Sequence, residues 1–231
     1  MITFEAVAKR YRNGREALVN VSLHVAPGEM VFLTGRSGAG KSTVLKLIAL
    51  LERPTRGRVL VGGADTGKLK ARRVPAFRRR VGVVFQDHRL LVDRPVFDNV
   101  ALPLIVADSS LKEIDKRVRA ALDQVGLLGS ERMLPAELSV GEQQRVGIAR
   151  AIISRPPILI ADEPTGNLDP QLASEVMTLF RRLNEVGVTV VVATHDLHLV
   201  RESGLRSIVL EDGRIAGSGP GDILPVIRAE R

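Results

Sequence analysis

The sequence contains no cysteine and no tryptophan, and aromatic residues make up only 3% of its 231 positions. The absence of cysteine excludes disulfide bonds and thiolate-bound metal centres. The scarcity of aromatic side chains argues against a surface that stacks single-stranded bases. Hydrophobic residues at 45% and charged residues at 26% are sufficient for a folded core and are not typical of a disordered chain.

Long hydrophobic runs are also absent. No apolar stretch approaches the roughly 20 residues that cross a bilayer as a helix. Residues 1–5 do not begin a basic segment followed by an apolar run, so we expect no secretory signal. The net charge of +8 favours anionic partners such as nucleotides, nucleic acid or acidic lipid, without choosing among them.

The strongest motif is the glycine-rich segment 35–42, GRSGAGKS. It matches the phosphate-binding pattern G-x-x-x-x-G-K-[ST] and lies between an expected buried strand at 30–34 and an expected helix. Glycines allow backbone N–H groups to turn inward around a polyphosphate, and the helix N-terminus adds a favourable field for anions. We expect Lys41 to reach the β- and γ-phosphates and the Ser42 hydroxyl to coordinate Mg²⁺.

Polar residues also follow three other expected buried strands, where ligand residues gather in parallel α/β sheets. They are Gln86, the pair Asp162 and Glu163, and His195. Two acids directly after a buried strand are costly unless they are solvated or bound to something. In a protein with a phosphate loop, an acid at this place normally serves Mg²⁺. A purely structural role for the histidine stays open at this point.

Residues 88–155 differ from the rest and look mainly helical. Ser110 with Glu113, and Ser139 with Glu142, have the spacing of a capping box, which predicts two helix starts. On its own the second box indicates only an ordinary helix N-terminus. The Asp169-Pro170 pair predicts a further helix start, and the chain closes with an expected hairpin over 207–216.

The N-terminal region, residues 1–30, predicts short strands in which Ile2, Phe4 and Ala6 share one face. Between them lies Tyr11, which either packs in the ordinary way or stacks on a nucleotide base. A basic segment over 68–80 is either a solvated face or a contact surface for acidic lipid or nucleic acid. Its basic residues are Lys68, Lys70, Arg72, Arg73, Arg78, Arg79 and Arg80.

The order of these motifs resembles the ABC ATPases from about residue 2 to 216. The segment 138–144, LSVGEQQ, resembles the signature of that family and argues against other phosphate-loop classes, such as small GTPases and nucleotide kinases. Segments 34–43, 85–94 and 141–151 resemble the branch that acts in bacterial cell division. The segment 161–169, ADEPTGNLD, is shared with importer-like and lipoprotein-release ATPases and supports only the broader group.

The resemblance implies an α/β fold: a RecA-like phosphate-loop core with a mixed, mainly parallel sheet, an N-terminal antiparallel β-subdomain and an inserted α-helical subdomain. The chain 1–231 would be a single ABC ATPase domain. Residues 1–87 and 156–216 would form the β-subdomain and the core, 88–155 the helical subdomain, and 217–231 a loosely held C-terminal tail.

The resemblance also implies roles at a site for ATP and Mg²⁺. Tyr11 would stack on adenine, Gln86 would sense Mg²⁺ and the attacking water, and Asp162 would hold the metal through water. Glu163 would polarise the hydrolytic water, and His195 would steady the γ-phosphate. The residues that cradle the phosphates would be Gly35, Arg36, Ser37, Gly38, Ala39, Gly40, Lys41, Ser42 and Thr43.

Three residues would act across a homodimer that forms on ATP binding. Ser139 and Gly141 would contact the γ-phosphate held by the other protomer, and Asp169 would link the two sites. One residue departs from the family pattern: Val140 stands where the signature usually has glycine, and valine takes φ > 0 only with strain. An ATP-binding module with little turnover is therefore one alternative.

The implied partner is an integral membrane subunit, contacted at the cytoplasmic face of the membrane at the division site by residues that follow Gln86. Through it, ATP cycling in the cell-division machinery would control cell-wall hydrolysis. The alternative within the family is an ATPase for lipoprotein release or small-molecule export. A soluble ABC protein acting on DNA or ribosomes usually has two cassettes or coiled-coil arms, so we expect no specific nucleic acid.

Overall fold

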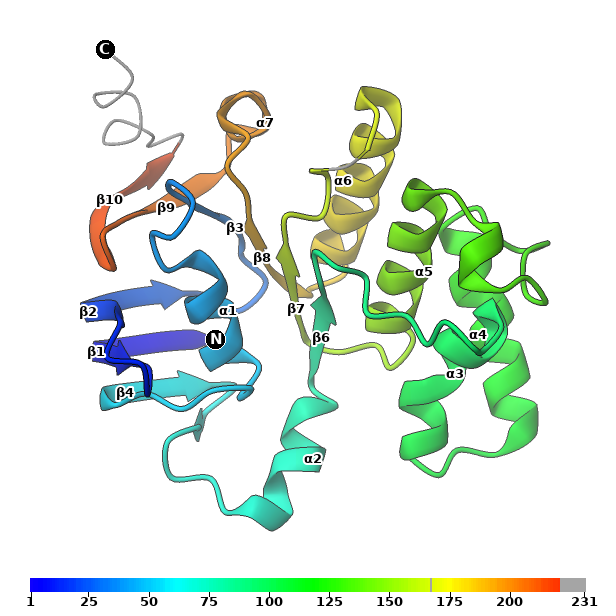
Figure 1. Cartoon of the computed structure of the whole chain (residues 1–231), viewed down its shortest axis with the longest axis horizontal. Coiled ribbons are helices and arrows are strands. Elements are labelled where there is room, and N and C mark those ends of the chain that lie inside the picture. Colours follow the sequence, from blue (N-terminus) through cyan, green and yellow to red (C-terminus); the bar gives the residue numbers. More distant parts are fainter. Residues whose placement is uncertain (167, 221–231) are drawn as a thin grey trace.

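Two β-sheets organise the computed structural model, which describes residues 1–166 and 168–220 (Figure 1). The first sheet has the order β2-β1-β4-β5, with β1 (Ile2–Arg10), β2 (Glu16–Val25), β4 (Arg56–Val61) and β5 (Ala64–Asp65). All its pairings are antiparallel, which confirms the expected N-terminal antiparallel β-subdomain.

The expected alternation along β1 is wrong at one residue. Ala6 is exposed and has φ 48°, whereas Val7 is fully buried. The pairing with β2 shifts between Phe4 and Val7, so the strand contains a bulge. After the bulge the odd-numbered Val7 faces the core, whereas before it the even-numbered Ile2 and Phe4 do. An irregularity of this kind leaves no mark in a hydrophobic pattern with period two.

The second sheet has the order β10-β9-β3-β8-β7-β6. Its strands β3, β6, β7, β8 and β9 are parallel, and only β10 is antiparallel. This mixed, mainly parallel sheet was predicted. The bounds are β3 (Met30–Thr34), β6 (Val81–Val84), β7 (Ile158–Asp162), β8 (Thr189–Ala193), β9 (Arg206–Glu211) and β10 (Arg214–Pro220).

The C-terminal strand is longer than expected. Gly217, Ser218 and Gly219 pair with Val209, Ile208 and Ser207 of β9, so the prediction of a loosely held tail from residue 217 is wrong for these residues. The remainder of that predicted tail, 221–231, lies outside the described residues, as does Asn167 of the 167–169 motif.

Three longer helices follow β6 and precede β7, and Figure 1 shows them together on one side of the core sheet as the inserted helical subdomain. They are α3 (Val96–Val106), α4 (Leu111–Gln124) and α5 (Val140–Ile152). The other helical elements are α1 (Lys41–Ile48), η1 (Ala71–Arg73), α2 (Val74–Arg78), η2 (Pro135–Glu137), α6 (Pro170–Glu185) and α7 (Leu197–Ser203).

The predicted helix caps are observed. Ser110 and Ser139 accept hydrogen bonds from the backbone N–H groups of Glu113 and Glu142, and the second capping box is reciprocal. Asp169 accepts from two backbone N–H groups of α6 at 3.0 Å. In the described residues, no helix is both long and apolar enough to span a membrane.

The core sheet is buried on both faces, which explains its apolar strands. Along β3, Met30 and Phe32 belong to a hydrophobic cluster shared with α5 and α6, whereas Val31 and Leu33 belong to a second cluster shared with α1 and the N-terminal sheet. The faces of the strands are therefore taken up by packing. Polar residues are left at the carboxyl ends of the strands, where the candidate site is found.

Candidate nucleotide site

The phosphate loop and the carboxyl ends of three strands surround one cavity of about 720 Å³. Loop residues come from the turn between β3 and α1 and from the first turn of α1. Other polar residues come from the carboxyl ends of β6, β7 and β8, and Tyr11 comes from the turn between β1 and β2. Of the predicted site residues, the cavity is lined by Tyr11, Arg36, Ser37, Gly38, Gly40, Lys41, Ser42, Thr43, Gln86, Asp162, Glu163 and His195.

The path of the loop requires glycine at two positions. Gly35 has φ 142°, and a Cβ there would lie 2.2 Å from the carbonyl oxygen of Leu210. Gly40 has φ 112°, and a Cβ there would lie 2.7 Å from the carbonyl oxygen of Ala17. Both contacts are with backbone, which cannot move aside as a side chain can. The glycines thus let the loop close against β2 and β9 while its N–H groups remain available to an anion.

Lys41 is held inside this loop. Its Nζ donates to the carbonyl oxygens of Gly35, at 2.6 Å, and Arg36, at 3.3 Å. It also lies 3.8 Å from Oε1 of Glu163, and only 7% of the residue is exposed. The buried lysine therefore lies beside the Glu163 carboxylate, and it lines the cavity.

Asp162 and Ser42 form the second polar pair of the site. Burial raises the pKa of the Asp162 carboxyl above its ordinary value, and a hydrogen bond from the Ser42 hydroxyl acts in the opposite direction. The charge of Glu163 raises the same pKa further, while Lys41 and Lys46 lower it. A cation bound at this pair would favour the ionised carboxylate.

Glu163 has an unusual backbone conformation, with φ 48°. Its N–H donates to the carbonyl oxygen of Ala193 on β8 at 2.9 Å, which ties it to the neighbouring strand. Its Oε2 lies 2.9 Å from Nδ1 of His195. The backbone N–H of His195 also donates to Oε2, at 3.3 Å. A non-glycine residue in this region costs of order 1 kcal/mol or more, and such strain is typical of functional sites.

Tyr11 and Gln86 lie at the rim of the cavity. The Tyr11 hydroxyl is 3.3 Å from Oγ1 of Thr43, and Nζ of Lys9 is 5.1 Å from the ring centroid. The tyrosine therefore lies beside the first turn of α1, within reach of a nucleotide on the loop. Its stacking on adenine stays a prediction, as does the role of exposed Gln86.

Ser139, Gly141 and Asp169 do not line this cavity. Ser139 and Asp169 are the N-caps of α5 and α6. A Cβ on Gly141 would lie 2.5 Å from Cδ2 of Leu172, so the first turns of the two helices pack against each other. The capped starts of α5 and α6 therefore lie side by side, outside the cavity at the phosphate loop.

Val140 does not adopt a left-handed conformation, so the backbone strain that a valine with positive φ would carry is absent at this position. It is the first residue of α5, it is not among the residues with positive φ, and half of it is exposed. The signature helix therefore begins normally with valine in place of glycine.

The Val140→Gly variant is consequently expected to show ATPase activity within about threefold of the parent, with stability lowered by at most about 1 kcal/mol because glycine is a poor helix former. Phosphate release and thermal denaturation measure the two effects. Activity found only in the glycine variant would show that valine disables the signature.

One polar contact beside the site was not predicted from the sequence. Arg150 of α5 donates to the carbonyl oxygens of His88 and, at 2.7 Å, Arg89, just after Gln86. His88 and Arg89 have φ 52° and 49°, so a left-handed segment is fastened to the signature helix. A guanidinium bonded to backbone about 60 residues away leaves no local pattern in a sequence.

The sequence profile of the ABC transporter family matches residues 18–166. The chain belongs to this family. The cassette is 55% identical over 217 residues to the cell division ATP-binding protein FtsE of Escherichia coli K12, covering 94% of this chain and 98% of that protein. FtsE of Bacillus subtilis is 47% identical over 215 residues, covering 93% and 94%.

Solved structures agree with this assignment. The dimeric ATP-binding cassette MJ0796, in a post-hydrolysis state bound to ADP and Pi, matches the chain with a TM-score of 0.89 and 38% identity, covering 95% of this chain and 98% of that one. The expected fold class and the expected ATPase activity of the cassette are both confirmed.

Proposed function

We propose that this cassette is the ATP-hydrolysing subunit of an ABC complex in bacterial cell division, where it acts on an FtsX-like integral membrane subunit that controls cell-wall hydrolysis. The observation that carries the proposal is the 55% identity to FtsE over almost the whole length of both chains. The cavity that unites the phosphate loop with Asp162, Glu163 and His195 provides the ATPase.

Mg²⁺ is the expected metal, and the residues present fit it. Hard oxygen donors are supplied by the hydroxyl of Ser42, the amide of Gln86 and the carboxylate of Asp162, which accepts a hydrogen bond from Ser42. Within the described residues, no group of three or more His, Cys, Asp or Glu forms a metal cage. In this proposal the metal would be held by these few protein ligands together with the phosphates and would neutralise the phosphate charge.

The chain's own residues supply the remaining chemistry. Lys41 and the loop N–H groups hold the phosphates, because the ammonium and the helix N-terminus both face the cavity. Glu163 orients and polarises the attacking water, since its backbone is tied to β8 and its carboxylate is held by His195. His195, whose side chain is 70% exposed, steadies the γ-phosphate.

The cassette works as a head-to-tail homodimer in this proposal. Ser139 and Gly141 lie outside the cavity of their own chain and are free to face the phosphate loop of a partner. Asp169, at the adjoining helix start, then links the two sites. The dimeric state of the similar cassette MJ0796 supports this arrangement.

The complex is placed at the cytoplasmic face of the membrane at the division site. The segment after Gln86 supplies an exposed apolar surface that suits a membrane subunit, since Leu91 is 40% and Val92 is 73% exposed. The chain itself is peripheral in this arrangement.

Affinity capture from native membranes with ATP tests the proposed partner. We expect an FtsX-like subunit to co-purify with the parent chain and to be lost from a Leu91→Glu, Val92→Glu variant. The matched control is Ile105→Glu, Val106→Glu at the far end of α3, where the side chains are 53% and 64% exposed. Recovery of a subunit with a multi-helix transport bundle would instead support lipoprotein release or small-molecule export.

A further inference from the structure

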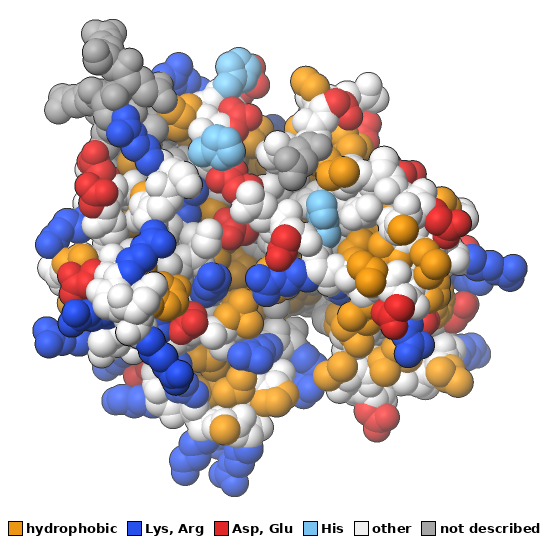
Figure 2. All heavy atoms as spheres, viewed as in Figure 1, with side chains coloured by type: hydrophobic (Ala, Val, Ile, Leu, Met, Phe, Trp, Pro, Cys, Tyr) orange, Lys and Arg blue, Asp and Glu red, His pale blue; other side chains and the backbone are white. Residues whose placement is uncertain are grey.

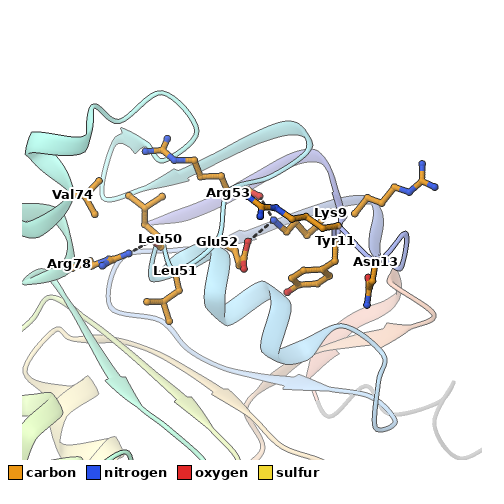
Figure 3. Close-up of a pocket in the computed structure, with 11 residues that line it drawn as sticks. Lys9, Tyr11, Asn13, Leu50, Leu51, Glu52, Arg53, Val74 and Arg78 are labelled. Atoms are coloured by element: carbon orange, nitrogen blue, oxygen red, sulfur yellow. Dashed lines mark hydrogen bonds and ion pairs between the residues drawn. The ribbon is translucent and has the colours of Figure 1, made fainter.

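A second cavity, of about 790 Å³, lies between the C-terminal end of α1, the helix α2 and the end of β1 (Figure 3). Its wall is strongly basic, and the single acid there, Glu52, is paired with Lys9 at 2.7 Å. The proposed ATPase cycle uses none of this wall except Tyr11 at its rim. The cationic side chains are Lys9, Arg10, Arg12, Arg53 and Arg78.

The positive charge continues beyond the cavity. Residues 66–86 include no Asp or Glu. In Figure 2, Lys and Arg side chains gather at the lower end of the molecule, where Figure 1 places α2. The side chains of Lys70, Arg72, Arg73 and Arg79 are exposed and make no ion pair or hydrogen bond within 1–166 and 168–220. Together with the wall of the cavity, these four residues form what we call the α2 basic surface.

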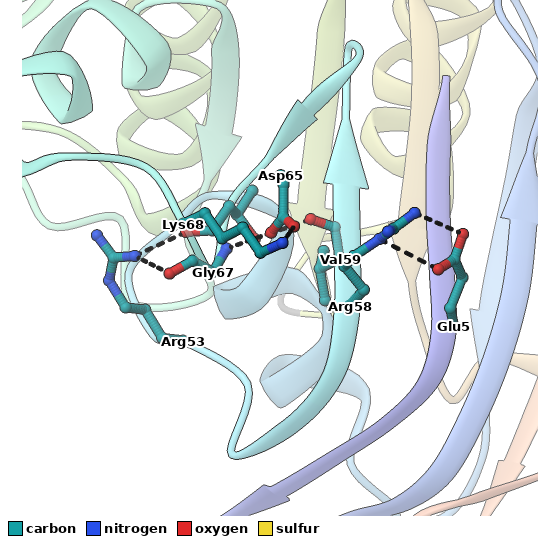
Figure 4. Close-up of polar contacts among 8 residues, drawn as sticks. Glu5, Arg53, Arg58, Val59, Asp65, Gly67 and Lys68 are labelled. Carbon is teal, nitrogen blue, oxygen red and sulfur yellow. Dashed lines mark hydrogen bonds and ion pairs between the residues drawn. The ribbon is translucent and has the colours of Figure 1, made fainter.

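Some basic residues elsewhere are matched by acids. On α4, Arg117 pairs with Glu113 at 3.0 Å and Arg119 with Asp115 at 3.2 Å. At the border of the α2 basic surface, Arg58 pairs with Glu5 at 3.2 Å, as Figure 4 shows. Residues 66–86 supply no acid that could pair with Lys70, Arg72, Arg73 or Arg79 in this way, so positive charge accumulates around α2.

The α2 basic surface is also held in place. The guanidinium of Arg53 donates to the carbonyl oxygens of Thr66, Gly67 and Leu69 at 2.9, 2.6 and 2.7 Å, and Figure 4 shows it directed at this loop. Arg78 donates to the carbonyl oxygen of Leu50 at 2.9 Å. A ligand would meet the guanidinium groups of Arg53 and Arg78 already ordered, which lowers the entropic cost of binding them.

Apolar side chains lie among the cations. Leu51, which is 40% exposed, and Val74 line the same cavity (Figure 3). Cations next to exposed apolar groups suit the boundary between lipid headgroups and acyl chains. Single-stranded nucleic acid would need stacking rings, and Tyr11 is the only aromatic residue of the cavity wall.

We infer that the α2 basic surface binds the acidic phospholipid headgroups of a bilayer and holds the cassette against the membrane independently of its membrane subunit. The inference rests on the proposed function for the presence of the cassette at a membrane. Binding to lipid vesicles requires no partner, so it is tested separately from partner capture.

The experiment is flotation of the full chain with vesicles of phosphatidylcholine, with and without about 30% phosphatidylglycerol, at about 0.1 M salt. We expect binding to the acidic vesicles only, and loss of that binding at about 1 M salt. Changing Lys70, Arg72, Arg73 and Arg79 to Gln should lower partitioning at least about 100-fold, because each basic residue at an anionic surface contributes about fivefold. Basal ATPase activity should remain, which shows that the variant is folded.

The matched control changes Lys112, Lys116, Arg181 and Arg201 to Gln. These residues are also exposed, and the net charge falls from +8 by the same four units. Equal loss in the control would overturn the inference, because net charge alone would then explain binding. It would also be overturned by equal binding to neutral vesicles, by displacement with ATP, by tighter binding of an oligonucleotide at the same salt, or by capture of the membrane subunit without vesicle binding.

Discussion

The Glu163→Gln variant is expected to lose ATP turnover by a factor of about 100 or more while it still binds ATP. Glutamine keeps the size of the side chain and the bond from the backbone N–H to Ala193 on β8, but it is a much weaker proton acceptor. Because hydrolysis loosens the dimer in the proposed cycle, a variant that binds ATP without cleaving it should accumulate as a closed dimer.

Two measurements check this expectation together. Phosphate release gives the turnover, and thiol cross-linking of a Ser37→Cys, Val140→Cys background reports the head-to-tail dimer with no other thiol in the chain. The matched control is Glu202→Gln, which alters another glutamate–histidine pair, at 3.3 Å from His198 on α7, and should leave both readouts unchanged. Turnover at the parent rate in Glu163→Gln would refute the assigned role.

The Lys41→Ala variant is expected to lose ATP affinity by about 100-fold. Lys41 is only 7% exposed and lines the cavity, so its charge is poorly screened there. Charge-assisted hydrogen bonds contribute about 1.5–3 kcal/mol, and about 2.8 kcal/mol corresponds to a factor of 100. Equilibrium binding of a fluorescent ATP analogue measures the change.

Lys46→Ala provides the comparison for this prediction. Lys46 lines the same cavity and also carries a positive charge, but it is exposed. Solvent screening limits such a charge to about 1 kcal/mol or less, so we expect a loss of no more than about fivefold. Equal affinities of the two variants would show that Lys41 has no special contact with the phosphates.

The parts of the fold that depend on periodicity and capping could be predicted from the sequence. The buried strands β3, β7 and β8 are continuous apolar runs, and Ser139 with Glu142 marks the start of α5 as expected. The bulge at Ala6 was not predictable, because it changes the pairing of β1 and β2 while both strands remain apolar on average. The extension of β10 depends on pairing with β9. A short, glycine-rich segment has no hydrophobic pattern from which such pairing could be predicted.

The candidate site divides in the same way. Gly35 and Gly40 were predictable because only glycine fits where the loop approaches neighbouring backbone. The left-handed conformation of Glu163 was not, since a glutamate gives no sign of positive φ and the strain is sustained by a bond to another strand. The roles of Ser139, Gly141 and Asp169 across a dimer stay predictions from motifs, because in the single chain these residues do not line the cavity at the phosphate loop.

The bonds from Arg150 make the segment after Gln86 and the helix α5 into one mechanical part. With 13 residues, α5 is about 20 Å long, and its other end carries Ser139. A displacement of Leu91 and Val92 by a membrane subunit would therefore tilt α5 and move Ser139. In the proposed complex the state of the membrane subunit would in this way influence the closure of the dimer on ATP, so coupling through α5 would run in both directions.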